Sequence, residues 1–196
     1  MALPALGPRS RGEPAETDRG VLEPELRELY TEYFALVWRT LRRLGVSVTA
    51  LEDAVQDVFL VVHRRWADFE RRSSVKTWIY GIVFRVAKDY RRARSRHAAR
   101  VERYAEELQS EAPGPRTPHE EAELREASRL VQELLAALPD DERAVLVLVE
   151  LEELSVREAA LAIGIHPSRC QRRLQAARRA FDRALARHVG TRRPSR

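Results

Sequence analysis

The sequence predicts an all-α protein in which two small helical domains are joined by a flexible acidic linker. Apolar residues recur with helical spacing in two blocks, 25–100 and 124–188, and no stretch keeps the alternation of a strand for long. Between the blocks, residues 101–123 combine seven glutamates with three prolines and a glycine, a composition typical of a flexible linker. Composition also predicts two flexible terminal segments, a disordered tail at 1–24 and a basic tail at 189–196.

The first domain is expected to contain a three-helix core. Its first helix ends at Gly45, a residue type common just after a helix C-terminus. Thr49 and Glu52 fit a capping box for the second helix, and Ser73 or Ser74 can cap the third. The three buried stripes are predicted to be Leu26, Leu29, Tyr30, Tyr33, Phe34, Val37, Leu41 and Leu44, then Leu51, Val55, Val58, Phe59, Val62 and Trp66, then Val75, Trp78, Ile79, Ile82 and Val86.

The second domain has the layout of a helix-turn-helix. Asp140 can cap one of its helices, and Ser155 with Glu158 forms a capping box that opens a short helix ending at Gly164. Pro167 then suits the first position of a longer arginine-rich helix. A short helix, a tight turn and a longer helix are typical of this DNA-binding motif. The buried stripe of the last helix is predicted to be Cys170, Leu174, Ala177, Phe181 and Leu185.

Charge is distributed along the chain in blocks. The formal net charge is +5, but segments 1–60, 61–100, 101–160 and 161–196 carry −3, +9, −10 and +9. Of the 35 basic residues only two are lysines, and the planar arginine side chain suits phosphates and base edges. Two basic blocks separated by an acidic block indicate two points of contact with a polyanion such as nucleic acid.

Several function classes are excluded by what the sequence lacks. Its apolar stretches are too short for a membrane span, and its first twenty residues lack the apolar core of a signal peptide, so we expect a cytoplasmic protein. Cys170 is the single cysteine, which excludes an internal disulfide, and its place on the buried stripe predicts a packing role. No P-loop, HExxH or GxSxG motif occurs, and the five histidines lack metal-ligand spacing. We therefore expect no enzyme, no cofactor and no metal.

The outward face of the last helix is the first candidate site. Arginine and glutamine can form paired hydrogen bonds with base edges, and arginines further along a helix can hold phosphates. A solvated basic face on an ordinary helix is the alternative. The residues on this face are Ser168, Arg169, Gln171, Arg172, Gln175, Arg178 and Arg179.

A second candidate site lies in the stretch 69–100, where aromatic and basic residues are interleaved. Bases of a single strand can stack on the rings while cations follow the backbone, and the loop Glu70–Thr77 can form a pocket for an unstacked base. Packing of the aromatic residues in the core is the alternative. Tyr80, Phe84, Lys88, Arg91 and Arg92 are expected on the face opposite the buried stripe, with Arg71, Arg72 and Lys76 just before it.

A third candidate is the outer face of the second helix. Acidic and amide side chains around an exposed leucine can dock against a partner helix, although such a stripe is also compatible with a simple solvated surface. Its residues are Glu52, Asp53, Gln56, Asp57, Leu60 and Arg64.

Two groups of motifs resemble a known family, the bacterial extracytoplasmic-function (ECF) sigma factors, over roughly 70% of the chain. Five motifs resemble conserved region 2 of this family: Leu29-Tyr30 with Tyr33, Arg42-Arg43-Leu44-Gly45, the run Asp53 to Phe59, Thr77-Trp78-Ile79-Tyr80 and the run Ala87 to Arg92. A second set of motifs resembles region 4: Leu138-Pro139, Glu142-Arg143, Glu150-Leu151-Glu152, Leu154-Ser155, Glu158-Ala159-Ala160 and Arg173-Leu174 with Ala177-Arg178.

The resemblance implies a subunit that binds core RNA polymerase and directs it to promoters, with an anti-sigma factor as a further candidate partner. It implies core polymerase binding by Asp53, Gln56, Asp57 and Leu60. It implies that the melted −10 element is bound by Arg71, Arg72, Ser73, Lys76, Thr77, Trp78, Tyr80, Arg85, Lys88, Arg91 and Arg92. It implies that the duplex −35 element is bound by Ser168, Arg169, Gln171, Arg172, Arg173 and Arg178.

Two departures from the family pattern concern promoter preference. Arg85 stands where many members have asparagine, and the run His166 to Gln171 replaces a commoner Gly-Thr-Val-Lys-like run. Two other functions remain open at this point. A stand-alone helix-turn-helix regulator would bind duplex DNA tightly by itself, usually as a dimer. A helical scaffold that does not bind DNA would leave both basic blocks unused.

Overall fold

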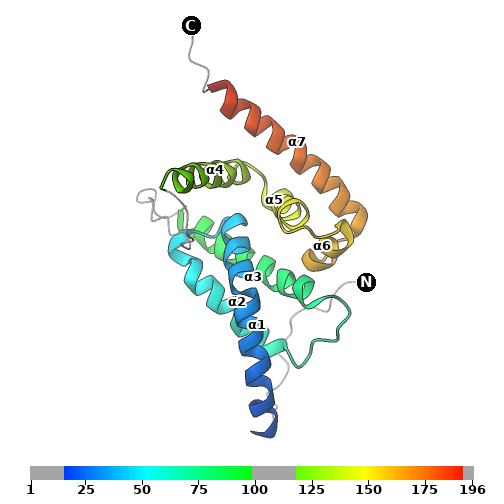
Figure 1. Cartoon of the computed structure of the whole chain (residues 1–196). Helices are drawn as coiled ribbons and strands as arrows, with labels where there is room; N and C mark the ends of the chain where they lie inside the picture. The colour runs from blue at the N-terminus through cyan, green and yellow to red at the C-terminus, as the bar shows by residue number, and fades with distance from the viewer. Residues whose placement is uncertain (1–15, 99–117, 192–196) are drawn as a thin grey trace.

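The computed structural model describes the backbone of residues 16–98 and 118–191, and every regular element within these ranges is helical, as the predicted all-α class requires. The helices are α1 (Glu16–Arg43), α2 (Leu51–Arg65), α3 (Val75–Ala98), α4 (Pro118–Ala136), α5 (Asp140–Leu146), α6 (Val156–Ile163) and α7 (Pro167–Thr191) (Figure 1). A 3₁₀ turn, η1 (Val48–Ala50), precedes α2, and a π turn, η2 (Val147–Leu151), follows α5.

The helix ends differ from the predicted boundaries at three places. Helix α1 begins at Glu16, inside the segment predicted as a disordered tail, and it continues through Pro24 with the loss of one backbone donor. Helix α4 begins at Pro118, inside the predicted linker, where a proline is tolerated because a first-turn N–H has no helical partner. Helix α7 extends to Thr191. The remaining residues of the predicted tails and linker lie outside the described part of the chain.

The first three helices enclose the predicted three-helix core. Val37 of α1, Val58 of α2 and Ile79 of α3 are fully buried, and α1, α2 and α3 contact one another pairwise. Gly45 follows α1 with a φ of 90°, a conformation that glycine adopts without a steric penalty. Ser74 caps α3, because its hydroxyl accepts a hydrogen bond from the backbone N–H of Thr77 at 3.1 Å.

The helix-turn-helix is present in α6 and α7. The Ser155 hydroxyl accepts a hydrogen bond from the Glu158 N–H at 3.2 Å, and the Glu158 carboxylate accepts one from the Ser155 N–H at 2.9 Å, so the predicted capping box is confirmed. Gly164 ends α6 with a φ of 72°, and Pro167 is the first residue of α7, as predicted. His166 lies just before α7 and its Nδ1 accepts from the next helical N–H, that of Ser168, at 3.3 Å.

Two predicted caps and two predicted core residues are wrong, and one of these core residues is Tyr30 of α1, which is 47% exposed. The turn η1 makes Ala50 the residue before α2, so Thr49 and Glu52 form no capping box. Asp140 is the first residue of α5 and follows Pro139 at the cap position, without a side-chain capping bond. On α7, Cys170 is buried as predicted, but Leu185 remains 37% exposed because Ala184 takes the buried position.

The two domains pack against each other and share one continuous hydrophobic core. Helix α3 lies between the α1–α2 pair on one side and α6 on the other, and α6 is followed by α7 on the outer side (Figure 1). Gly81 of α3 permits close approach, since a Cβ atom there would lie 3.1 Å from the carbonyl oxygen of Ala162. The second domain therefore covers a face of the first.

Candidate functional site

The N-terminal half of α7 presents an exposed polar face. Pro167 starts the helix, and Cys170 and Leu174 anchor its opposite side in the core. This placement leaves the outward side chains open to a ligand, as a recognition helix requires. The exposed residues of this face are Ser168, Arg169, Gln171, Arg172, Gln175 and Arg179.

Arg173 and Arg178 differ from these residues because each is held by a carboxylate of the same domain. Arg173 lies 2.7 Å from Asp141 at the start of α5, and its side chain is 28% exposed. Arg178 donates from Nε to Glu150 of η2 at 2.9 Å. Both arginines therefore hold α7 against α5 and η2 in this structure.

On α3, the structure overturns the expectation that Tyr80 lies on an open face. Tyr80 is fully buried beneath the second domain, and its hydroxyl donates a hydrogen bond to Glu152 at 2.8 Å. Thr77 is also buried, with 2% exposure, and its hydroxyl lies 2.9 Å from that of Ser74. The cause is the second domain, because α6 packs against α3 and Glu152, which precedes α6, contacts the Tyr80 hydroxyl.

The basic residues further along α3 fall into two groups. Lys88 and Arg91 line a narrow crevice against Asp140 and Asp141 of α5, and Arg91 forms an ion pair with Asp140. Arg85 is exposed, and partial desolvation together with the nearby charge of Arg65 lowers its pKa. The structure thus separates Arg85 from the residues that face the second domain. Arg92, which lies further along α3, is exposed as well.

The loop before α3 is supported by a cluster of three aromatic rings. The ring centroids of Phe69 and Trp78 are 5.0 Å apart, and Trp66 stacks on Phe69 at 5.7 Å. Periodicity had placed Trp66 and Trp78 in buried stripes but had not shown that they meet Phe69. The predicted loop residues Arg71, Arg72 and Lys76 are exposed, and Ser73 is half-buried.

The outer face of α2 is exposed as the sequence predicts. Leu60 is 43% exposed, and Asp53 and Gln56 lie on the same exposed face. Asp57 accepts a hydrogen bond from the Tyr90 hydroxyl at 2.8 Å. Burial and this hydrogen bond raise the pKa of Tyr90 to about 12.

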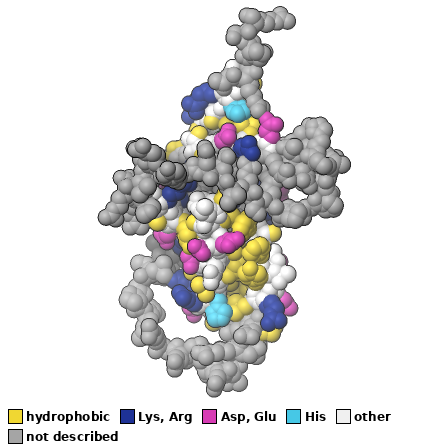
Figure 2. Space-filling model, turned by 90° about the vertical axis from the view of Figure 1, so that its left-hand side faces the viewer, with side chains coloured by type: hydrophobic (Ala, Val, Ile, Leu, Met, Phe, Trp, Pro, Cys, Tyr) yellow, Lys and Arg dark blue, Asp and Glu magenta, His cyan; other side chains and the backbone are white. Residues whose placement is uncertain are grey.

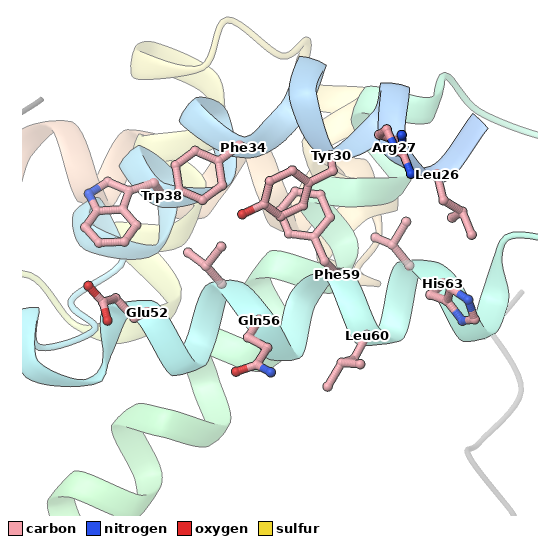
Figure 3. Close-up of a pocket in the computed structure, with 12 residues that line it drawn as sticks. Leu26, Arg27, Tyr30, Phe34, Trp38, Glu52, Gln56, Phe59, Leu60 and His63 are labelled. Atoms are coloured by element: carbon pink, nitrogen blue, oxygen red, sulfur yellow. The ribbon is translucent and has the colours of Figure 1, made fainter. Parts of the chain in front are cut away.

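Beside this face, α1 and α2 form an apolar groove of about 750 Å³ that the sequence analysis did not identify. The rings of Tyr30, Phe34 and Trp38 follow one another along α1, opposite Phe59 of α2 (Figure 3). The centroids of Tyr30 and Phe59 are 4.6 Å apart. The side of the molecule on which α2 lies shows hydrophobic side chains next to acidic ones (Figure 2). The apolar stripes of α1 and α2, considered together, are the sequence feature that could have indicated this groove.

A buried carboxylate joins the two domains. Glu152 is 3% exposed and accepts hydrogen bonds from Arg39 at 2.9 Å, Arg43 at 2.7 Å and Tyr80 at 2.8 Å. Burial alone would raise the pKa of Glu152, but the hydrogen bonds from these three side chains outweigh it and hold the pKa below its ordinary value. No sequence pattern indicates this contact, because Glu152 and its partners are more than 70 residues apart in the chain.

Within the described residues, we find no group of three side chains suited to hold a metal ion. None of the described helices is long and apolar enough to cross a membrane. The Cys170 thiol is fully buried, as predicted, and burial raises its pKa.

Comparison with protein families supports the sigma-factor resemblance in both domains. The Sigma-70 region 2 family matches residues 29–97, and the Sigma-70, region 4 family matches residues 128–181. The chain is 30% identical over 139 residues to the RNA polymerase sigma-H factor of Pseudomonas aeruginosa, covering 68% of this chain and 72% of that protein. It is 31% identical over 120 residues to the ECF RNA polymerase sigma-E factor of Haemophilus influenzae, covering 59% of this chain and 64% of that protein.

Solved structures show the same fold. CnrH, in complex with the cytosolic domain of CnrY, matches with a TM-score of 0.60 and 22% identity over 82% of this chain and 87% of that one. The sigma factor RpoE, in complex with the anti-sigma factor NepR from Bartonella quintana, matches with a TM-score of 0.65 and 18% identity over 83% and 97%. The matches to both sigma regions and to named sigma factors do not favour a stand-alone helix-turn-helix regulator. With both sigma regions matched in order and a P. aeruginosa relative covered over most of its length, the chain belongs to the ECF RNA polymerase sigma factors.

Proposed function

We propose that this chain binds core RNA polymerase and directs it to promoters, where region 4 (the second domain) reads the −35 element and region 2 (the first domain) reads the −10 element. The observation that carries this proposal is the exposed N-terminal half of α7. Gln171 and Arg172 have the donors and acceptors needed for base edges in the major groove, and Arg169 with Ser168 can position the helix on phosphates.

The −10 element is bound as a single strand by the loop before α3 and by the basic face of α3. The exposed cations Arg71, Arg72 and Lys76 are suited to follow a phosphate backbone, and the rings beneath the loop offer flat surfaces for bases. Tyr80 and Arg91 belong to this surface only when region 4 has moved away, because region 4 covers them in this structure.

Core polymerase docks on the outer face of α2. Asp53, Gln56 and Asp57 supply polar contacts around the exposed Leu60, and the neighbouring apolar groove can take side chains of a partner helix. The chain then acts in the cytoplasm as a specificity subunit without catalytic activity of its own. Two solved relatives are bound to CnrY and to the anti-sigma factor NepR, which makes an anti-sigma factor a further candidate partner.

Association with polymerase tests this function directly. The full chain is mixed with bacterial core RNA polymerase and analysed by size-exclusion chromatography, and the complex is assayed for binding to promoter-containing genomic fragments. The proposal expects co-elution, and sequence-specific DNA binding only in the presence of polymerase. Failure to co-elute, combined with tight binding of the chain alone to duplex DNA, would instead indicate a stand-alone regulator.

A further inference from the structure

The loop between α2 and α3 is an open, basic segment that contains two adjacent serines. Residues 66–74 form no helix or strand, and the loop projects at one side of the molecule (Figure 1). Arg71 and Arg72 precede the serines and Lys76 follows them, and all three cations are exposed. Arg72 pairs with the exposed Glu70, whereas Arg71 and Lys76 form no ion pair with a side chain in the described ranges. The two serines therefore lie in an accessible and positively charged surface.

Of the two serines, Ser74 has the accessible hydroxyl group. Ser73 is half-buried, and its hydroxyl donates a hydrogen bond to the carbonyl oxygen of Ser74 at 3.2 Å. Ser74 is exposed, and its oxygen accepts a hydrogen bond from the backbone N–H of Thr77 at 3.1 Å. This bond orients the Ser74 side chain at the end of the loop without burying it. Ser74 is thus the hydroxyl that an enzyme can reach from solvent.

The order of the charges in the loop indicates which class of enzyme this hydroxyl suits. Arg71 and Arg72 stand three and two residues before Ser74. Guanidinium groups form bidentate pairs with carboxylates, so this segment fits a kinase whose substrate groove is lined with acidic side chains. A kinase that selects acidic substrates would repel the same segment. Ser74 therefore has the surroundings of an acceptor for a Ser/Thr kinase of basic-substrate specificity.

A phosphoryl group on Ser74 would reverse the electrostatic role of the loop. Phosphoserine carries about −1.5 to −2 charges at neutral pH, against +3 from Arg71, Arg72 and Lys76. Its oxygens can accept charge-assisted hydrogen bonds from these cations, which are then engaged within the chain. Because the same cations are those proposed to follow the backbone of the −10 strand, an attached phosphate competes with the phosphates of DNA.

We propose that Ser74 is a phosphorylation site for a Ser/Thr kinase of basic-substrate specificity, and that its modification blocks single-strand binding by the loop. In the transfer, the Ser74 oxygen attacks the γ-phosphorus of Mg·ATP, the bond from this phosphorus to the β–γ bridging oxygen breaks, ADP leaves, and the hydroxyl proton passes to the base of the kinase. The blocking role rests on the proposed function for the identity of the DNA. The acceptor role of Ser74 depends only on the loop.

The acceptor role is tested with the full chain and one kinase of this class. The chain is incubated with Mg·ATP and the catalytic subunit of cAMP-dependent protein kinase, and tandem mass spectrometry locates the phosphate. We expect modification at Ser74, no modification of that position in Ser74→Asn, and much slower transfer when Arg71→Gln is combined with Arg72→Gln. No phosphate on Ser74, or transfer to Ser73 in its place, would overturn the site.

The blocking role is tested with two variants of similar shape. Asn and Asp can both cap α3 with a side-chain oxygen, but they differ by one negative charge. Fluorescence anisotropy follows the binding of a single strand of mixed sequence, about 12 nucleotides long, at several salt concentrations. Relative to Ser74→Asn, Ser74→Asp should bind about fivefold more weakly at 0.1 M salt, with a salt slope smaller by about 0.7, the value for one lost phosphate contact. The phosphorylated chain should lose on the order of 20-fold.

A matched control adds the same charge elsewhere in the first domain. Thr49 is exposed and lies at the opposite end of α2, about 22 Å from the loop along this 15-residue helix. Thr49→Asp should therefore bind the strand like the wild type, and circular dichroism verifies that every variant is folded. Equal weakening by Thr49→Asp, or equal affinities of Ser74→Asp and Ser74→Asn, would overturn the blocking role.

These measurements separate the inference from the proposed function. A wild-type chain that does not bind the strand would overturn −10 binding by the loop and the blocking role together. The transfer to Ser74 is measured without DNA, so its result would still decide the acceptor role. Neither assay contains polymerase, and a failure of polymerase association would leave both interpretations unchanged.

Discussion

The hydroxyl group of Tyr80 in region 2 lies 2.8 Å from the carboxylate of Glu152 in region 4 and donates a hydrogen bond to it. Both side chains are buried, and Arg39 and Arg43 also donate hydrogen bonds to the same carboxylate. This contact unites a residue that sequence reasoning assigned to DNA with one to which it assigned no site. It makes the relation between the two regions the main finding of the structure.

The pH dependence of stability should report on Glu152. Its pKa is held below the ordinary value in the folded chain, so its contribution to the free energy of unfolding is present above the unfolded pKa and is lost as the pH falls through the folded pKa. Between about pH 6 and pH 3, the wild type should lose more stability than Glu152→Gln. Urea unfolding at a series of pH values measures this difference, and parallel curves would contradict the assigned role.

Arg143 should be required for the stability of region 4. Its guanidinium group is buried and donates to the carbonyl oxygens of Leu135 at 2.6 Å, Ala136 at 2.9 Å and Leu138 at 3.1 Å, which closes the end of α4. Arg143→Lys keeps the charge but cannot reach all three oxygens, so we expect a loss of about 2–4 kcal/mol in urea unfolding. The exposed Arg157→Lys serves as the matched control, and equal effects of both changes would refute the capping role.

Glu153 should be a site where glycine stabilises the protein. It follows η2 with a φ of 59°, a left-handed conformation that is costly for residues with a Cβ atom. Glu153→Gly should therefore raise the free energy of unfolding by about 0.5–1 kcal/mol, whereas Glu153→Ala, which retains the Cβ, should not. Thermal unfolding of the two variants distinguishes relief of strain from loss of the carboxylate.

Local chemistry explains which parts of the fold were predictable. Ser155 with Glu158, the left-handed Gly164 and the helix-starting Pro167 act within a few residues, and all three predictions are confirmed. The capping box at Thr49 was wrong, because a short 3₁₀ turn moved the helix start by one or two residues without changing the residue pattern.

The contact between the domains was not predictable in the same way. Periodicity indicates that one face of α3 packs on α1 and α2, but it does not show whether a second domain lies on the opposite face. Tyr80 is amphipathic, and its burial depends on Glu152, which lies 72 residues away. The predicted DNA and polymerase contacts remain predictions, and the structure adds that Arg173 and Arg178 are held by Asp141 and Glu150.

The exposed face of α7 should carry base specificity. Gln171→Ala or Arg172→Ala should cost about 1–3 kcal/mol of binding to the preferred −35 duplex and much less on a scrambled duplex, because base contacts are lost. Arg173→Ala should act mainly on stability, since Arg173 pairs with Asp141. Fluorescence anisotropy with both duplexes measures the loss of affinity on each. Equal losses for Gln171→Ala on the two duplexes would show that Gln171 does not read bases.

The outer face of α2 should determine polymerase affinity. Asp53→Ala combined with Gln56→Ala removes two exposed polar side chains, so association with core polymerase should weaken while helicity stays intact. Glu28→Ala, an exposed change on α1 outside the groove lining, is the matched control. Surface plasmon resonance with immobilised core polymerase measures both, and unchanged association of the double variant would remove this face from the interface.

Sequencing the 5′ ends of transcripts tests the central claim most directly. Core polymerase is incubated with fragmented genomic DNA of the source organism, with and without the full chain, and the start sites are compared. If the chain is a sigma factor, we expect new, discrete start sites preceded by common −35 and −10 elements. These sites should be lost when the Gln171→Ala change is combined with Arg172→Ala. Start sites that are identical with and without the chain would contradict it.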